Sequence, residues 1–344
     1  MNLKKGDLYF IGERDLLTGA GSAYFKIGLV KASRRGDSEN RLGEHQTGNP
    51  RQLSVVEIVT APAISDLEKR LHHEFATDRI LGEWFEFTAE ALDSAVRTAQ
   101  ALAAEQWDHI GALLLAKELA SVESTLEEIE PVEDDYGRFA VAHAAKHLGS
   151  EVKRLRLRCD AIFRSALEAG KDVQRYATNV PKKATTFRKE ALAEEHPDLY
   201  ASYVVEKEAL TPLFLLKKPN TDGEFSLPSE FETFSAEMDA LMDLAQHDDG
   251  RLEQLHLARL GLLKYESQAK WDRSLAEANL RARCGASSGI AGLVSWARKV
   301  KVEQKFDDAA FKADHPTLAA QFTETVDTSA FVVSPMRSYA LEAR

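Results

Sequence analysis

Four side chains in the first seventy residues have types that could carry catalytic chemistry. Tyr9 lies in a short apolar run, Lys26 lies in a second run, Arg41 opens a polar segment, and Glu68 begins the motif EKRLHHEF. A tyrosine can act as a base when a neighbouring cation favours its ionised form. An arginine fork binds anions such as phosphate, and a carboxylate binds Mg²⁺. The set therefore offers a base, an anion clamp and a metal ligand.

Two histidines stand one helical turn from members of this set. His45 follows Arg41 by four residues, and His72 follows Glu68 by the same spacing. Residues four apart share one face of a helix. We expect His45 to orient a water molecule or accept its proton. His72 would either bind a metal beside Glu68 or, as we favour, support Glu68 through a buried hydrogen bond.

Short strands and helices must position these side chains. Runs of β-branched and aromatic residues separated by Gly/Ser/Thr loops indicate strands, and apolar residues that recur every four positions indicate helices. Taken alone, a tyrosine in such an apolar strand is more often a core residue than a catalyst. In chain order the pattern predicts strands at 8–12 and 24–30, a helix at 40–46, a strand at 52–60, a helix at 66–77 and an extended segment at 83–87.

Beyond Thr88 the pattern becomes helical. A long Ala/Leu/Glu-rich helix is predicted over 107–130, ended by Pro131. The composition change near residue 90 indicates a domain boundary. The predicted organisation is a domain at 1–90, a helical linker at 91–134, a first helical module with a basic block at 135–220, and a second helical module at 221–344.

The two helical modules are similar to each other at an offset of 119 residues. In each copy we predict a helix that enters at a phenylalanine, breaks before a His-Pro pair, continues for one turn and leads to a β-strand. The two histidines are better explained by capping or packing than by catalysis. The matching positions are Phe187, His196, Pro197, Leu199 and Tyr203 in the first copy, and Phe306, His315, Pro316, Leu318 and Phe322 in the second.

The order of motifs over the first 90 residues, about a quarter of the chain, resembles the GIY-YIG nuclease superfamily. Tyr9 in DLYFIG, Lys26-Ile27-Gly28, Arg41 in RLGEHQTGNP, Glu68 in EKRLHHEF and the strand GEWFEF follow one another in that order. The resemblance is to a phage-associated branch in which lysine commonly takes the second tyrosine position. It implies a small antiparallel sheet flanked by helices, and with the helical pattern beyond Thr88 the expected class is α+β, a sheet domain followed by a mainly α-helical region.

The same resemblance implies a metal-dependent endonuclease that hydrolyses phosphodiester bonds of DNA, in phage biology or in defence against foreign DNA. Tyr9 would be the base, and Lys26 would favour its phenolate form. Arg41 would clamp the scissile phosphate, while Glu68 would hold one Mg²⁺ or Mn²⁺ ion. His45 would assist the attacking water. The implied partner is DNA, with RNA not excluded.

Charge is unevenly distributed along the chain. The net charge is −11, but residues 146–189 hold 12 basic and 4 acidic residues, whereas residues 194–253 hold 15 acidic and 4 basic residues. The basic block would contact phosphates, or it would form a solvated face that pairs with the acidic segment. The candidate phosphate contacts are Lys153, Arg154, Arg156 and Arg158.

Composition limits the remaining function classes. A chain of 344 residues is expected to form more than one domain, and no apolar run is long enough for a membrane span. Two cysteines are too few for a disulfide framework, and without a secretory signal we expect a cytoplasmic protein. Two alternatives remain open: an inactive nucleic-acid-binding module, or an interaction scaffold that carries a nuclease domain. Residues 135–344 could mediate homodimerisation or bind a protein partner.

Overall fold

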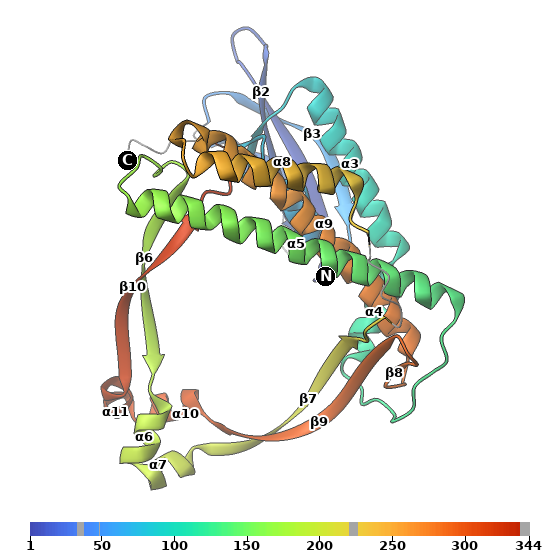
Figure 1. Ribbon diagram of the computed structural model, residues 1–344, viewed down its shortest axis with the longest axis vertical. Coiled ribbons are helices and arrows are strands. Elements are labelled where there is room, and N and C mark those ends of the chain that lie inside the picture. Colours follow the sequence, from blue (N-terminus) through green and yellow to red (C-terminus); the bar gives the residue numbers. More distant parts are fainter. Residues whose placement is uncertain (33–37, 48, 220–225, 338–344) are drawn as a thin grey trace.

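The computed structural model describes residues 1–32, 38–47, 49–219 and 226–337, and for residues 38–41 it describes the helix but not the side chains. An N-terminal sheet with helices on both faces stands on a layer of long helices, from which two β-ribbons extend (Figure 1). The predicted α+β class is confirmed. No helix among the described residues is long and apolar enough to cross a membrane.

The N-terminal sheet is antiparallel throughout its described strands. The strands follow the order β3-β1-β2-β5-β4, with β1 at the centre pairing with both β2 and β3. The predicted hairpin and third strand are confirmed, and each is longer than expected. The strand bounds are β1 Gly6–Arg14, β2 Gly21–Lys31, β3 Gln52–Ala61, β4 Arg79–Leu81 and β5 Trp84–Glu86.

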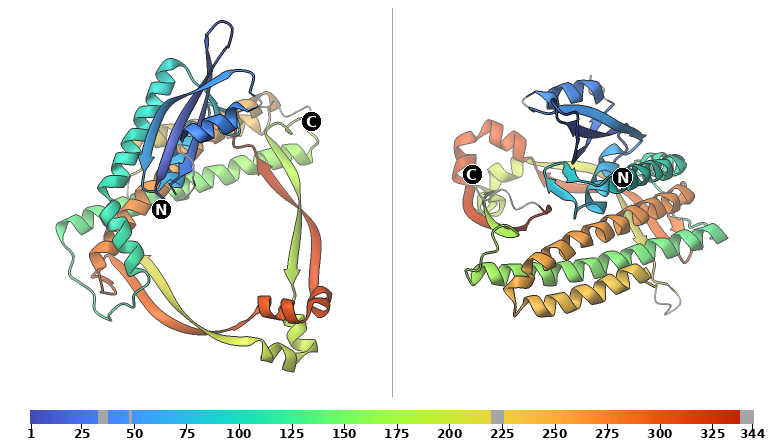
Figure 2. Two further views of the ribbon diagram at one scale, coloured as in Figure 1. Left: turned by 180° about the vertical axis from the view of Figure 1, so that it is seen from behind. Right: turned by 90° about the horizontal axis from the view of Figure 1, so that it is seen from above.

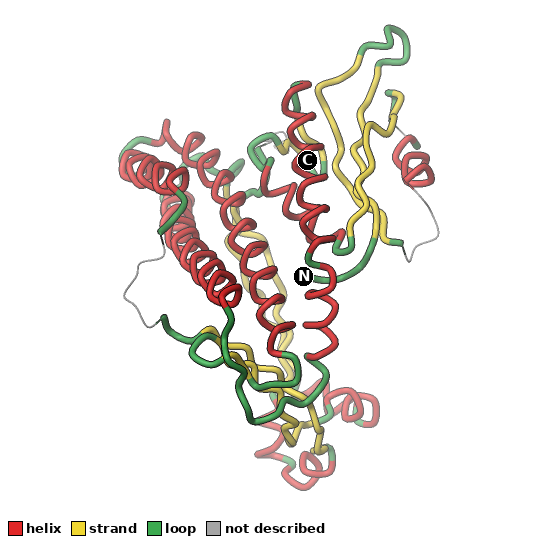
Figure 3. Tube along the Cα trace, turned by 90° about the vertical axis from the view of Figure 1, so that its right-hand side faces the viewer, coloured by secondary structure: helices red, strands yellow, loops and turns green. Residues whose placement is uncertain are grey.

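Helices cover the two faces of the sheet. Helix α1 (Ser38–Gln46) lies on the outer face, where Leu42 packs with Tyr9 and other apolar side chains of β1 to β3. Helices α2 (Ile64–Glu74) and α3 (Ala89–Asp108) pack on the inner face through a larger apolar core. Figure 3 shows α1 on the far side of the sheet from the long helices.

The prediction of one continuous helix over 107–130 is wrong. Helix α3 ends at Asp108, α4 covers only Ile110–Leu119, and no helix follows before Val132. The segment after Leu119 contains serine, threonine and β-branched residues, which weaken a helix because their side chains compete for the backbone or lose rotamer freedom. The backbone of this segment forms hydrogen bonds with distant strands instead of within a helix. Ser124 N donates to Arg298 O, and Ile129 N donates to Gly289 O.

Three long helices form the layer beneath the sheet. They are α5 (Glu133–Glu168), α8 (Ser229–Ala245) and α9 (Leu252–Cys284). Seen from above, the order is sheet, α3, α9, α5 and α8 (Figure 2). Trp271 and Leu275 of α9 belong to the same core as the inner face of the sheet. The sheet and the helical layer are therefore held together by a continuous apolar interior.

Two long antiparallel ribbons leave opposite ends of the helical layer. One pairs β6 (Ala177–Phe187) with β10 (Thr323–Val333). The other pairs β7 (Val204–Leu216) with β9 (Val294–Phe306), and the short β8 (Gly289–Ile290) pairs with the base of β9. The ribbons converge on four short helices, so that the backbone trace forms a ring (Figures 1 and 2). These helices are α6 Lys189–Glu195, α7 Pro197–Ser202, α10 Asp308–Asp314 and α11 Pro316–Gln321.

The predicted duplication is present in the structure. In both copies a helix breaks before the His-Pro pair, continues for about one turn and leads to a strand, β7 in one copy and β10 in the other. One detail is wrong, because Phe187 and Phe306 end the strands β6 and β9 rather than begin helices. Each strand pairs with a strand of the other copy, so the two copies interlock.

Candidate active site

Tyr9 is positioned by the register of the first hairpin. It lies opposite Gly28 in the β1–β2 pair and is only 1% exposed. A Cβ atom added at Gly28 would lie 2.4 Å from the Tyr9 hydroxyl oxygen, which is closer than real Cβ atoms approach. The glycine therefore provides the space in which the tyrosine ring lies across β2.

The hydroxyl of Tyr9 is hydrogen-bonded to a side chain of α1. Its oxygen lies 3.1 Å from Nε2 of His45, and the two rings are tilted at 52° to each other. His45 is partly exposed, whereas Tyr9 is buried. The structure thus brings together Tyr9 and His45, which the sequence placed 36 residues apart. Arg41 falls on the same helix, but its side chain lies outside the described residues.

Lys26 forms an ion pair at the edge of β2. Its Nζ atom lies 3.1 Å from a carboxylate oxygen of Glu83, in the turn between β4 and β5. The backbone holds the same turn in place, since Ile27 N donates to Glu83 O at 3.0 Å. Lys26 and Gly28 lie two residues apart and therefore on one face of β2. Glu83 thus lies beside the strand against which Tyr9 packs.

Glu68, on α2, has an unusual titration behaviour. Burial and the nearby carboxylate of Glu83 raise the pKa of Glu68 to about 7, although the charges of Arg79, Lys31 and Lys26 oppose this rise. Burial penalises the charged form, and a like charge nearby penalises it further. Burial and the neighbouring carboxylate therefore favour the protonated form of Glu68 more than in an exposed glutamate. Perturbed carboxylates of this kind are concentrated at functional sites.

His72 fixes α2 to β2. Its Nε2 atom donates a hydrogen bond to the carbonyl oxygen of Ile27 at 3.0 Å, and its ring packs 5.3 Å from that of Phe85. Burial lowers the pKa of His72 to about 4, so the ring is neutral at physiological pH. This bond runs to the backbone of β2 and not to Glu68, so His72 holds the helix that carries Glu68 against β2.

Two charged residues of this site escaped the sequence reasoning. Glu83 and Arg79 flank the turn at Gly82, which adopts a positive φ of 56°. A signal was present, because Glu83 directly precedes the Trp-Phe pair of GEWFEF. What the sequence did not show was that β5 pairs with β2, which places this turn beside Lys26.

The arrangement fits a hydrated divalent cation. Among the described residues, no group of three or more His, Cys, Asp or Glu side chains is placed to hold a metal. Glu68 and Glu83 instead offer two neighbouring carboxylates that repel each other. Mg²⁺ usually keeps several waters and binds through one or two carboxylates plus substrate oxygens. A cation between these carboxylates would relieve their repulsion and displace the proton of Glu68.

The side chains predicted to contact phosphates lie on two sides of α5, one facing α8 and the other facing α9. Arg158 pairs with Asp239 of α8, and Arg154 lies 3.6 Å from the same carboxylate. Arg156 instead pairs with Glu266 of α9 at 2.9 Å, and Lys153 is exposed. The acidic segment thus neutralises part of the basic block and leaves the rest facing α9.

A family model for the T5orf172 domain matches residues 9–100, just over a quarter of the chain. This domain is phage-associated and related to nuclease-like folds, and the GIY-YIG family itself gives no match. No curated protein and no solved structure matches the chain. The matched segment contains all the residues of the candidate site.

Proposed function

We propose that this protein is a divalent-metal-dependent endonuclease that hydrolyses phosphodiester bonds of DNA, with chemistry of the GIY-YIG type. One observation carries the proposal: Tyr9, hydrogen-bonded to His45, packs on Gly28, and two residues away on the same strand the charge of Lys26 acts on Glu68, whose pKa is raised to about 7. The similarity of residues 9–100 to a phage-associated domain supports it and favours a role in phage biology or in defence against foreign DNA.

The residues divide the work of hydrolysis. Tyr9 and His45 would together form the base that takes a proton from the attacking water, at the partly exposed His45 end of the pair. Glu68 and Glu83 would hold Mg²⁺ or Mn²⁺, which would offset the negative charge growing on the phosphoryl oxygens. Lys26 keeps Glu83 in place through its ion pair. Arg79 supplies a further positive charge, and Arg41 remains the proposed phosphate clamp.

Cleavage assays test this function directly. Purified protein is incubated with supercoiled plasmid, linear duplex, single-stranded DNA and RNA, each with EDTA, Mg²⁺ or Mn²⁺. We expect metal-dependent cleavage of DNA, and we expect Glu68→Gln to lower the rate by at least ~10² because the variant lacks an anionic ligand. Asp93→Asn, at an exposed position of α3, serves as the control and should retain the rate.

Calorimetric titration with Mn²⁺ separates metal binding from turnover. The wild-type protein should bind the ion, and Glu68→Gln should bind it more weakly. Absence of cleavage of every substrate by the wild-type protein would refute the proposal. Equal cleavage by the wild-type protein and Glu68→Gln would remove Glu68 from the site.

A further inference from the structure

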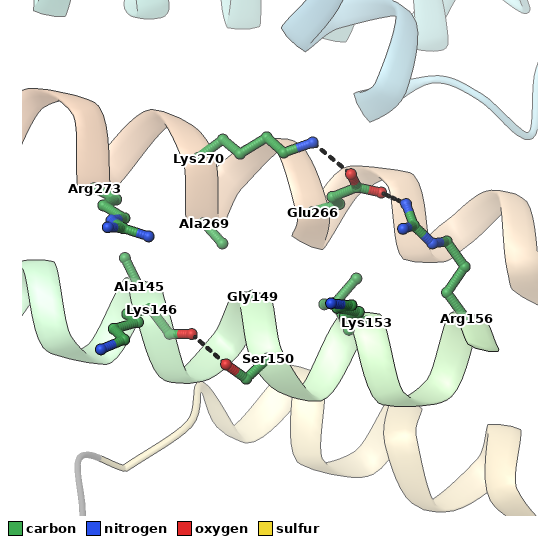
Figure 4. Close-up of a pocket in the computed structure, with 11 residues that line it drawn as sticks. Ala145, Lys146, Gly149, Ser150, Lys153, Arg156, Glu266, Ala269, Lys270 and Arg273 are labelled. Carbon is green, nitrogen blue, oxygen red and sulfur yellow. Dashed lines mark hydrogen bonds and ion pairs between the residues drawn. The ribbon is translucent and has the colours of Figure 1, made fainter. Parts of the chain in front are cut away.

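A groove runs between α5 and α9 on the side away from α8 (Figure 4). Its volume is about 500 Å³, and small residues form its floor. A Cβ atom added at Gly149 would lie 3.7 Å from Cβ of Ala269, so the two helices approach closely at this point. With Ala145 also on the floor, no large side chain fills the groove.

Cationic side chains line both edges of the groove. Positions 146, 153 and 156 of α5 share one helical face, as do positions 266, 270 and 273 of α9, because their spacings are close to whole turns. The charged residues that line the groove are Lys146, Lys153, Arg156, Lys270 and Arg273, with Glu266 as the one carboxylate among its lining residues.

Carboxylates neutralise only part of this charge. Arg273 pairs with Glu277, which lies outside the lining, at 2.6 Å. Glu266 accepts ion pairs from both Arg156, at 2.9 Å, and Lys270. Lys146 and Lys153 are exposed, and within the described residues neither forms an ion pair with a carboxylate. The groove therefore keeps a positive charge in a protein whose net charge is −11.

On the opposite face of α5 the cations are paired with carboxylates. There Arg154 and Arg158 lie against Asp239, and Arg158 also lies 3.6 Å from Asp243. The acidic side chains of α8 thus compensate this face. The basic stretch that looks continuous in the sequence is divided by the helix into a neutralised face and a cationic one.

The cationic groove borders the domain that carries the candidate active site. Lys270 lines both this groove and a smaller pocket between α9 and α2, in which Lys69 also lies. Lys69 directly follows Glu68 on α2. A polyanion seated in the groove would therefore pass beside the helix that positions Glu68.

We propose that this groove binds the phosphate backbone of duplex DNA. It would supply the attraction that residues 1–100, with 13 basic and 15 acidic residues, lack. This inference rests on the proposed function, because the groove would hold the DNA that the candidate active site cleaves. From Lys146 to Arg156 the groove extends for about 15 Å along α5. One strand of duplex DNA places a phosphate every ~3.4 Å along its axis, so about four phosphates of that strand span this length.

The salt dependence of binding to duplex DNA tests the groove. Fluorescence anisotropy is measured with EDTA present, between 50 and 200 mM NaCl, for two duplexes of unrelated sequence. The variant Lys146→Gln/Lys153→Gln/Lys270→Gln should flatten the slope of log affinity against log salt by about two to three units, since each phosphate contact contributes about 0.9. Both sequences should lose affinity equally, because backbone contacts do not read bases.

Arg154→Gln/Arg158→Gln is the matched control from the other face of α5. It should leave the slope unchanged. An unchanged slope in the triple variant, or an equal flattening in the control, would refute the groove as the binding site. Circular dichroism melting curves confirm that the variants are folded.

A second pair of variants tests the same site by a gain of binding. Each of two carboxylates pairs with two cations. Glu266 does so inside the groove, and Asp239 does so on the α8 side of α5. Glu266→Gln should strengthen DNA binding several-fold, whereas Asp239→Asn should leave it within about twofold. A larger gain from Asp239→Asn would refute the groove.

Failure of this inference is distinguishable from failure of the proposed function. Metal-dependent cleavage with an unchanged salt slope would leave the nuclease assignment standing and remove the groove. A flattened slope without cleavage under any metal condition would retain the groove and remove the nuclease assignment.

Discussion

The hydroxyl of Tyr9 lies 3.1 Å from Nε2 of His45, so that β1 and α1 share a hydrogen bond on the outer face of the sheet. Apolar side chains surround the tyrosine, which is 1% exposed, while the histidine is partly exposed. A proton from a water at the surface would therefore reach the pair at His45. We propose on this basis that the two residues act as one functional unit.

The first prediction concerns this unit. Tyr9→Phe and His45→Gln should each lower the single-turnover rate by about 10²–10⁴, the usual range for a lost general base. The double variant should lose little more than either single variant, because residues that act together are not additive. Losses that multiply in the double variant would show that the two residues act independently. Unchanged DNA affinity in all three variants serves as the control.

The second prediction follows from the titration of Glu68. Its pKa is raised in the folded state from 4.5 to about 7, so the folded state binds the proton more tightly than the unfolded state. The associated stability is present below pH 4.5 and is lost as the pH rises through about 7. Because glutamine does not ionise, Glu68→Gln should exceed the wild-type stability at pH 8 by up to ~3 kcal/mol, and by much less at pH 5.

Thermal denaturation at both pH values measures this difference. Mg²⁺ at pH 8 should raise the Tm of the wild-type protein more than that of Glu68→Gln, since an ion stabilises the folded state in proportion to how tightly it binds. A stability difference that is equal at pH 5 and pH 8 would contradict the raised pKa of Glu68.

The candidate site was only partly predictable from the sequence. Tyr9, Lys26 and Glu68 were proposed from the sequence because each lies in a recognisable local motif. Glu83 and its ion pair with Lys26 were missed, because they depend on the pairing of β5 with β2. Local sequence patterns show which face a residue occupies, but they do not show which distant turn lies beside it.

The third prediction concerns the space that Gly28 provides. Gly28→Ala would place Cβ 2.4 Å from the Tyr9 hydroxyl oxygen and must displace the ring or separate β1 from β2. We expect cleavage to fall at least as far as in Tyr9→Phe. Gly21→Ala, in the same strand with no atom within 4 Å of the added Cβ, is the matched control and should stay active. Full activity in Gly28→Ala would argue against a role for the position of Tyr9.

The ribbons show a different limit of sequence reasoning. The break before each His-Pro pair was predicted because proline restricts the residue before it. The strands β6 and β9 were missed. Most residues of β6 and of the second half of β9 are exposed on both faces, and the alternation of a half-buried strand is confined to residues 294–298 of β9. Their pairing with strands of the opposite copy also left no local signal, although it determines the shape of the molecule.

The fourth prediction concerns the contact that joins the two ribbons. Phe311 is fully buried at the tip, where its ring lies 5.7 Å from that of Phe187 and 5.3 Å from that of Phe306. Two-stranded ribbons are only marginally stable without such support. Phe311→Ala should cost the tip about 3–5 kcal/mol through lost burial and a cavity.

Hydrogen–deuterium exchange locates this loss. The four ribbon strands should exchange faster in Phe311→Ala, while the N-terminal sheet keeps its protection, because the tip cluster shares no residue with the core of the sheet. Val302→Ala, at a position of β9 that is 58% exposed, is the control and should change little. Equal loss of protection in the sheet would show that the ribbons and the sheet domain unfold as one unit.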